Sequence, residues 1–75
     1  MDSDSGLRYA LICLMNRYVA ESGNAEAIAE WDKTRVFSSN NPFDEKGRKN
    51  IATHPEEFAN LFMLFEKVSK MIRQE

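Results

Sequence analysis

The sequence predicts an all-α protein, a small helical bundle with two long antiparallel helices and one short helix, completed by dimerisation. Two long segments carry apolar residues three and four positions apart, which is the spacing of a helix that faces a core. Capping and stop residues bound these segments. The chain of 75 residues forms one domain, and it has one cysteine and one histidine, so neither a disulfide nor a typical zinc site can support so small a core.

The first long helix is predicted over residues 6–21, after a flexible tail at residues 1–5. Ser5 or Asp4 can cap it, and Ser22-Gly23 ends it. An a/d-like line of four residues is expected to face the core: Leu7, Leu11, Leu14 and Tyr18. Ile12 and Val19 form a second apolar strip about 100° around the helix, which we expect to serve as an interface.

A shorter helix is predicted over residues 24–35, with Asn24 as its cap. Ile28 and Trp31 share one face. Trp31 is expected to fill the gap between the longer helices, and its indole N–H then needs a partner. Residues 38–52 are predicted to be a solvated polar connection, with or without a short helix, from which Phe43 docks on the core.

The second long helix is predicted over residues 53–73. Thr53 and Glu56 match a capping box, and Pro55 is tolerated in a first helical turn. Acidic residues then lie near the start of the helix and basic residues near its end, as the helix dipole favours.

The apolar face of this helix is unusually wide. It spans roughly 180° at 100° per residue, whereas an ordinary surface helix shows a stripe of about 100°. The expected core residues of this face are Phe58, Leu61, Phe65, Val68 and Ile72, while Phe62, Leu64 and Met71 widen it. Since such a face needs two neighbours, the candidate interface comprises Phe62, Leu64, Met71, Ile12 and Val19.

Composition argues against several functions. With 10 basic and 12 acidic residues, the chain lacks the strongly basic character that is typical of nucleic-acid binding. The longest apolar run, Tyr9 to Met15, is far shorter than the ~20 residues that cross a bilayer. The acidic, polar start is not typical of a signal peptide, and a lone cysteine favours the cytoplasm. We expect no catalytic residues, cofactor, metal or membrane partner.

The expected function is therefore that of a small non-catalytic intracellular protein, with an interaction or regulatory role. It acts through a helical surface, as a homodimer, and binds another protein. The alternative is a DNA-binding regulator, because residues 23–30 resemble the start of a helix-turn-helix. A degenerate motif around residues 24–39 would then bring five basic side chains to DNA: Lys33, Arg35, Lys46, Arg48 and Lys49. Asn41-Pro42-Phe43 also matches the tripeptide bound by endocytic EH domains, although we expect Phe43 to be buried.

Overall fold

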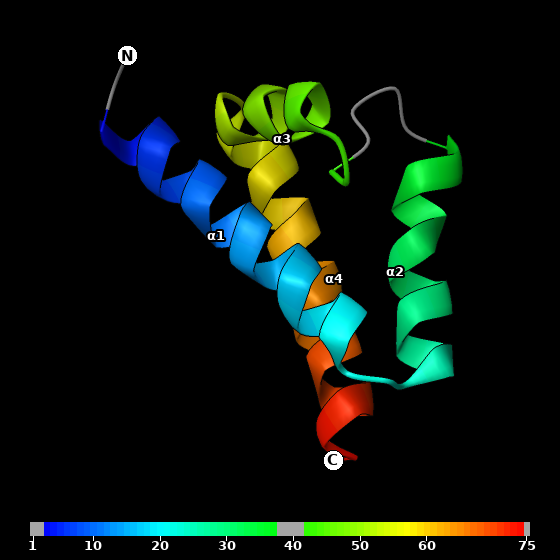
Figure 1. Ribbon diagram of the computed structural model, residues 1–75. Helices are drawn as coiled ribbons and strands as arrows, with labels where there is room; N and C mark the ends of the chain where they lie inside the picture. The colour runs from blue at the N-terminus through cyan, green and yellow to red at the C-terminus, as the bar shows by residue number, and fades with distance from the viewer. Residues whose placement is uncertain (1–2, 38–41, 75) are drawn as a thin grey trace.

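The computed structural model describes residues 3–37 and 42–74, and within them the chain is entirely helical apart from turns (Figure 1). The four helices are α1 (Ser3–Glu21), α2 (Ala25–Phe37), α3 (Glu45–Ala52) and α4 (Pro55–Arg73). The prediction of an all-α small helical bundle is therefore confirmed, with two shorter helices instead of one. The side chains of residue 3 and of residues 35–37 lie outside the description.

The two long helices run in the same direction, so the prediction that they are antiparallel was wrong. Arg8, near the start of α1, donates a hydrogen bond to the carbonyl of Ala52, just before α4 begins. Further along both helices, the rings of Tyr18 and Phe65 lie 5.8 Å apart. The reason is that α2 carries the chain back and α3 crosses at that end, so that α4 starts beside the start of α1 (Figure 1).

The first helix begins earlier than predicted. α1 includes Ser3 to Ser5, and Ser5 is buried, so the tail predicted at residues 1–5 was wrong for these three residues; residues 1–2 lie outside the description. The predicted stop at Ser22-Gly23 is confirmed. The Ser22 hydroxyl donates to the carbonyl of Val19 at 2.7 Å, and Gly23 has a φ of 71°, which favours glycine.

α1 buries a different face from the one that we expected. Ile12, Met15 and Val19 are almost fully buried, whereas Leu7 and Leu14 are 62% and 61% exposed. Tyr18 is also exposed and Leu11 is half-buried. The predicted core strip was therefore wrong for Leu7, Leu14 and Tyr18. Ile12 and Val19 belong to the core and cannot form an interface.

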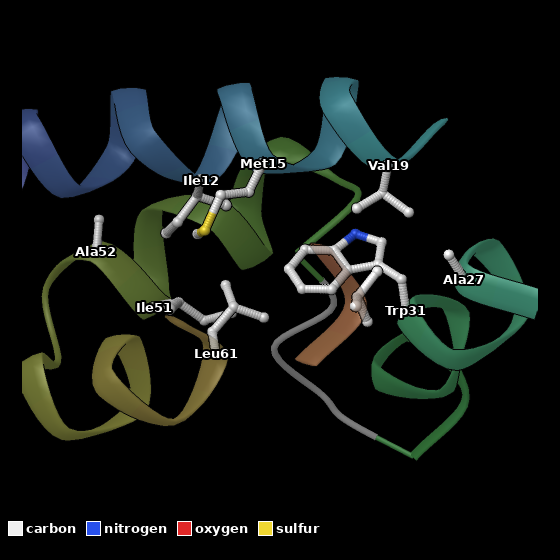
Figure 2. Close-up of a cluster of buried hydrophobic side chains, with 9 residues drawn as sticks. Ile12, Met15, Val19, Ala27, Trp31, Ile51, Ala52 and Leu61 are labelled. Carbon is white, nitrogen blue, oxygen red and sulfur yellow. The ribbon is translucent and has the colours of Figure 1, made fainter. Parts of the chain in front are cut away.

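A buried tryptophan explains this orientation of α1. Trp31 of α2 is completely buried between the helices (Figure 2), as predicted, and its indole N–H donates to Oδ1 of Asn16 at 2.9 Å. Asn16 Nδ2 donates in turn to the carbonyl of Pro42. Asn16 is next to the Ile12–Val19 side of α1 on the helical wheel. Turning that side inward thus satisfies the indole N–H, whereas turning the Leu7–Leu14 side inward would not.

Asn24 joins the start of α2 to the end of α4. Its side-chain oxygen accepts from the amide of Ala27 at 3.0 Å, which confirms the predicted N-cap. Its side-chain nitrogen donates to the carbonyl of Met71 at 3.2 Å. One side chain therefore satisfies an amide at the start of α2 and adds a second donor to a carbonyl at the end of α4, which also accepts from the amide of Gln74.

The segment predicted as a polar connection, with or without a short helix, contains the helix α3 over residues 45–52. Asp44 caps the helix by accepting from the amide of Gly47 at 2.6 Å, and Glu45 and Lys49 form an i,i+4 ion pair at 2.8 Å. Ile51 and Ala52 then turn into the core. Two apolar residues about two turns beyond the cap therefore anchor this charged stretch to the core as a helix.

The capping box at Thr53 was also wrong. Thr53 is the C-cap of α3, and its hydroxyl donates to the carbonyl of Asn50 at 2.8 Å. His54 is the N-cap of α4, without a side-chain capping bond, and Pro55 is the first helical residue. The turn between α3 and α4 is very short, so the Thr53 hydroxyl caps the C-terminus of α3 and is not available to cap the N-terminus of α4.

The core surrounds Trp31. Ile12 and Met15 of α1 point towards Ile51 and Leu61, and Val19 points towards Trp31 (Figure 2). Of the predicted α4 core, Leu61 and Val68 are buried, and the others are partly buried against the same cluster: Phe58, Phe65 and Ile72, together with Ile28 of α2. Met15, Ala27, Ile51 and Ala52 complete the core and were not among the residues predicted.

The orientation of α1 predicts that two neighbouring alanine substitutions destabilise the protein to different extents. Ile12→Ala should lower the free energy of unfolding by about 2–4 kcal/mol, because it leaves a cavity in the core. Leu14→Ala, the matched control, should cost less than about 1 kcal/mol. Urea unfolding followed by Trp31 fluorescence at low protein concentration measures both. Equal losses would contradict the orientation.

The hydrogen bonds of Asn16 predict a second pattern. Asn16→Leu should cost on the order of 1–3 kcal/mol, because the indole N–H of Trp31 and the carbonyl of Pro42 lose their partner. The loss should be smaller in a Trp31→Phe background, which lacks the indole N–H. A double-mutant cycle by circular dichroism measures this coupling; additive losses would show that the two side chains are not coupled.

Candidate interaction surface

Large apolar side chains remain exposed on α1 and α4, two helices that contact each other. We define the α1–α4 face as Leu7, Leu14 and Tyr18 of α1 with Phe62 of α4. Tyr18 and Phe62 are 42% and 40% exposed, so all four side chains present large apolar areas. Leu7, Leu14 and Tyr18 follow one another at intervals of seven and four residues, which places them along one line of the helix.

Aromatic contacts join the two helices across this face. The ring of Tyr18 meets Phe65 edge-on at 5.8 Å. Phe65 lies 6.4 Å from Phe62, which in turn lies 6.1 Å from Phe58. Such separations and tilted arrangements are favourable for aromatic pairs. The exposed rings are thus held in place by half-buried neighbours.

The interface residues predicted from sequence differ in how far they are exposed in the structure. Phe62 lies on the α1–α4 face as expected. Leu64 and Met71 are half-buried against the core, and the carbonyl of Met71 accepts from Asn24 of α2. α2 therefore covers much of the flank that was expected to be open, while Ile12 and Val19 are buried.

Sequence reasoning missed Leu7, Leu14 and Tyr18 as surface residues, although a signal was available. Arg17 and Glu21 flank their strip on the helical wheel and pair with each other at 3.1 Å, with highly exposed side chains. Charges beside an apolar strip indicate that the strip borders solvent. Asn16, which accepts the hydrogen bond from the Trp31 indole, lies beside the strip that contains Ile12 and Val19.

The basic residues of the DNA-binding alternative are not gathered on one surface. Lys33 of α2 pairs with Glu30 at 3.0 Å, and Lys49 of α3 pairs with Glu45. Arg48 donates to the carbonyl of Phe43 at 2.8 Å and lies 5.6 Å from the Tyr9 ring centroid. Lys46 is exposed on α3, and the side chain of Arg35 lies outside the described residues.

The helix-turn-helix reading has no second helix packed in the required way. α2 is one continuous helix from Ala25 to Phe37, and residues 38–41 lie outside the description. Among the described residues, α2 and α3 are not in direct contact, whereas the two helices of such a motif are packed together.

The ion pairs shift the pKa values of their members. Hydrogen bonds from Lys33 and then Lys67 lower the pKa of Glu30 below its usual 4.5, because they favour the charged form. Lys49 lowers the pKa of Glu45, which raises the pKa of Lys49 in return. A hydrogen bond to Tyr9 raises the pKa of Arg48. These groups stay charged at neutral pH.

The two residues with the most catalytic potential are in unrelated surroundings. Cys13 is half-buried on α1. His54 is exposed, and its Nδ1 lies 2.7 Å from the carbonyl of Asn50. Since a carbonyl only accepts, Nδ1 carries the proton in this contact. Within residues 3–37 and 42–74, no group of three or more acidic, histidine or cysteine side chains could hold a metal ion.

Neither the Asn41-Pro42-Phe43 tripeptide nor the surface hollows bring the candidate residues together in a binding site. Pro42 is buried and Phe43 packs edge-on against Trp31 at 6.3 Å, which confirms that Phe43 docks on the core and removes it from EH-domain recognition; Asn41 lies outside the described residues. Hollows of about 340 and 390 Å³ open beside α3 without Cys13 or His54 in their lining. A hollow of about 370 Å³ is lined by His54, Pro55, Glu56 and Glu57, and Cys13 does not border it. None of the described helices has the length and apolar character needed to cross a membrane.

Comparisons with protein-family models, curated protein sequences and solved structures gave no match to this chain.

The lowered pKa of Glu30 predicts a specific acid sensitivity. Its pairs with Lys33 and Lys67 stabilise the folded protein above the usual carboxyl pKa of about 4.5, and this contribution is lost as the pH falls through the lower folded-state pKa. Glu30→Gln should therefore reduce stability at pH 7 and leave it nearly unchanged at the most acidic pH at which both proteins fold.

Thermal unfolding of both proteins between pH 7 and pH 3 measures this difference. Lys67→Gln serves as the matched control, because it removes one of the same pairs and should show the same trend to a smaller extent. A difference between the Glu30→Gln variant and the parent that does not change with pH would contradict the assignment.

Proposed function

We propose that this protein is a small, non-catalytic cytoplasmic interaction protein that works as a homodimer through the α1–α4 face. The observation that carries the proposal is the exposure of Leu7, Leu14 and Tyr18 along one line of α1, with Phe62 also exposed on α4, which α1 contacts. An exposed apolar surface that extends over two helices is typical of a protein-binding site.

The size of the core supports a second chain as the occupant. Nine buried hydrophobic residues form the core within the described part of the chain, and the single cysteine excludes an internal disulfide. Domains this small commonly depend on staples, on very good packing or on oligomerisation. A homodimer would enlarge the apolar core without any new sequence element.

The expected affinity is moderate. Complete burial of a leucine or phenylalanine contributes about 1.5–3 kcal/mol, and each side chain of the α1–α4 face is already about half covered, so roughly 1 kcal/mol remains for each. Association itself costs about 4–15 kcal/mol. Since the cost of association offsets most of this gain, we expect a reversible dimer and not a permanent one, and a regulatory role would suit a dimer that responds to concentration.

We also propose that the dimer binds a different protein, through surfaces that dimerisation leaves exposed. The lone cysteine, Cys13, supports a reducing compartment such as the cytoplasm. DNA binding is not proposed, because the basic side chains of the described residues are paired or dispersed.

The proposal predicts that one added charge abolishes self-association. Leu14→Glu should shift the protein to a monomer at tens of micromolar, because dimerisation would bury an unpaired carboxylate. Met63→Glu is the matched control: Met63 is 66% exposed, yet it projects from the solvent side of α4, between Ala59 and Lys67 on the helical wheel.

Sedimentation equilibrium over a dilution series measures the result. The parent protein and the Met63→Glu variant should dimerise alike, with unchanged helical circular dichroism in both variants. A parent protein that stays monomeric at a hundred micromolar would remove the homodimer from the proposal. A dimer that persists in the Leu14→Glu variant would move the interface to another surface.

A further inference from the structure

We propose that a hollow between the start of α1 and the end of α3 binds a small carboxylate with an apolar body, such as a medium-chain fatty acid. The hollow measures about 390 Å³, which is within the range of small-molecule sites, about 300–1,000 Å³. It shares no residue with the α1–α4 face. The inference therefore goes beyond the proposed function and gives the protein a small-molecule ligand.

The lining of this hollow is almost entirely apolar. It comprises Ser5, Gly6 and Tyr9 of α1, Lys49 and Ala52 of α3, and Thr53 just after α3. Ser5 and Ala52 are 4% and 1% exposed, so they form the floor, and the Ala52 side chain points towards α1 (Figure 2). An apolar group that entered the hollow would bury apolar surface of the protein as well as its own.

Gly6 keeps the hollow open. A Cβ atom added at this position would meet no atom within 4 Å, although Gly6 lies within α1, where glycine is less favourable than alanine. The half-buried ring of Tyr9, one turn further along the helix, adds an aromatic wall. A side chain at position 6 would therefore occupy part of the hollow.

The charges around the hollow favour a negatively charged ligand. Among the described residues that line it, Lys49 alone carries a charge. Two arginines contact lining residues: Arg8 donates to the carbonyl of Ala52, and the guanidinium of Arg48 lies 5.6 Å from the centroid of the Tyr9 ring. The bond from Arg8 also offsets the negative end of the α3 dipole. Three cations thus attract a carboxylate to an apolar hollow.

The nearby acidic side chains do not cancel this attraction. Glu45 pairs with Lys49 at 2.8 Å, but both side chains are 66% exposed, and such a surface pair contributes little. Lys49 can therefore turn to a ligand without a large loss. Asp4 is exposed and projects roughly 160° away from Gly6 on the helical wheel, so its carboxylate lies on another side of α1.

A small amphiphile matches this arrangement better than a purely polar anion or a neutral apolar compound. The apolar lining offers few donors to an inorganic anion, and a neutral compound would gain nothing from the three cations. The apolar body of the ligand would cover Tyr9 and Ala52. Its carboxylate would lie at the rim beside Lys49, where a charge-assisted hydrogen bond can form.

Titration of the ¹⁵N-labelled protein with octanoate, below its micelle concentration, tests the proposal. The amide signals of Gly6 and Thr53 should shift on binding, whereas that of Gly23, just beyond the other end of α1, should not. Octanol is the uncharged control. It should bind about fivefold more weakly or worse, because it lacks the attraction to the cations.

Four substitutions separate shape from charge. Gly6→Phe should abolish binding by filling the hollow, while Gly6→Ala, its matched control, should weaken binding only slightly. Lys49→Gln should weaken octanoate binding by about two- to fivefold. Glu45→Gln should strengthen it by a similar factor, because Lys49 then loses its competing partner. Circular dichroism should show the helical content of the parent in every variant.

The outcomes that contradict the proposal are specific. Signals of Gly6 and Thr53 that do not shift in the parent protein would overturn it, as would octanol that binds as tightly as octanoate. Equal affinities in the Lys49→Gln and Glu45→Gln variants would remove the role of charge, and with it the carboxylate. A folded Gly6→Phe variant that binds octanoate like the parent would place the ligand outside the hollow.

Discussion

The hydrogen bond between the Trp31 indole and Asn16 determines how the rest of the molecule is arranged. A fully buried indole needs a partner for its N–H, since an unsatisfied buried donor costs about 1–3 kcal/mol. Asn16 provides that partner from α1 and uses its amide nitrogen to hold the carbonyl of Pro42. One polar side chain therefore joins α1, α2 and the segment that leads into α3.

The exposed surface follows from that bond. α1 carries two apolar strips, and only one of them can face inward together with Asn16. The strip with Ile12 and Val19 enters the core, so the strip with Leu7 and Leu14 must face outward. The apolar surface proposed as the dimer interface is thus a consequence of the hydrogen bond that the Trp31 indole requires. Within that surface, the half-buried ring of Phe65 contacts both Tyr18 and Phe62.

The sequence was sufficient for the helical class, for the long C-terminal helix and for the burial of Trp31, because these depend on local spacing and on residue size. It was insufficient for the choice of face on α1, which depends on a hydrogen bond to a residue 15 positions away. The capping role of Thr53 could not be predicted either, since its single hydroxyl could cap the end of α3 or the start of α4. The sequence showed that the apolar face of α4 is wide. Which of its residues α2 covers and which remain exposed to solvent depends on where α2 packs.

The double role of Asn24 has a consequence for the order of folding. The corner between α3 and α4 is held by contacts within a few residues, such as those of Thr53 and His54 with Asn50, and local contacts form early because they close short loops. The bond from Asn24 to Met71 spans 47 residues and links α2 to the far end of α4. This bond needs both α2 and the last turn of α4, just as the bond from Arg8 to the carbonyl of Ala52, across 44 residues, needs both α1 and α3. Contacts of this kind close long loops, so we expect them to form after the local ones.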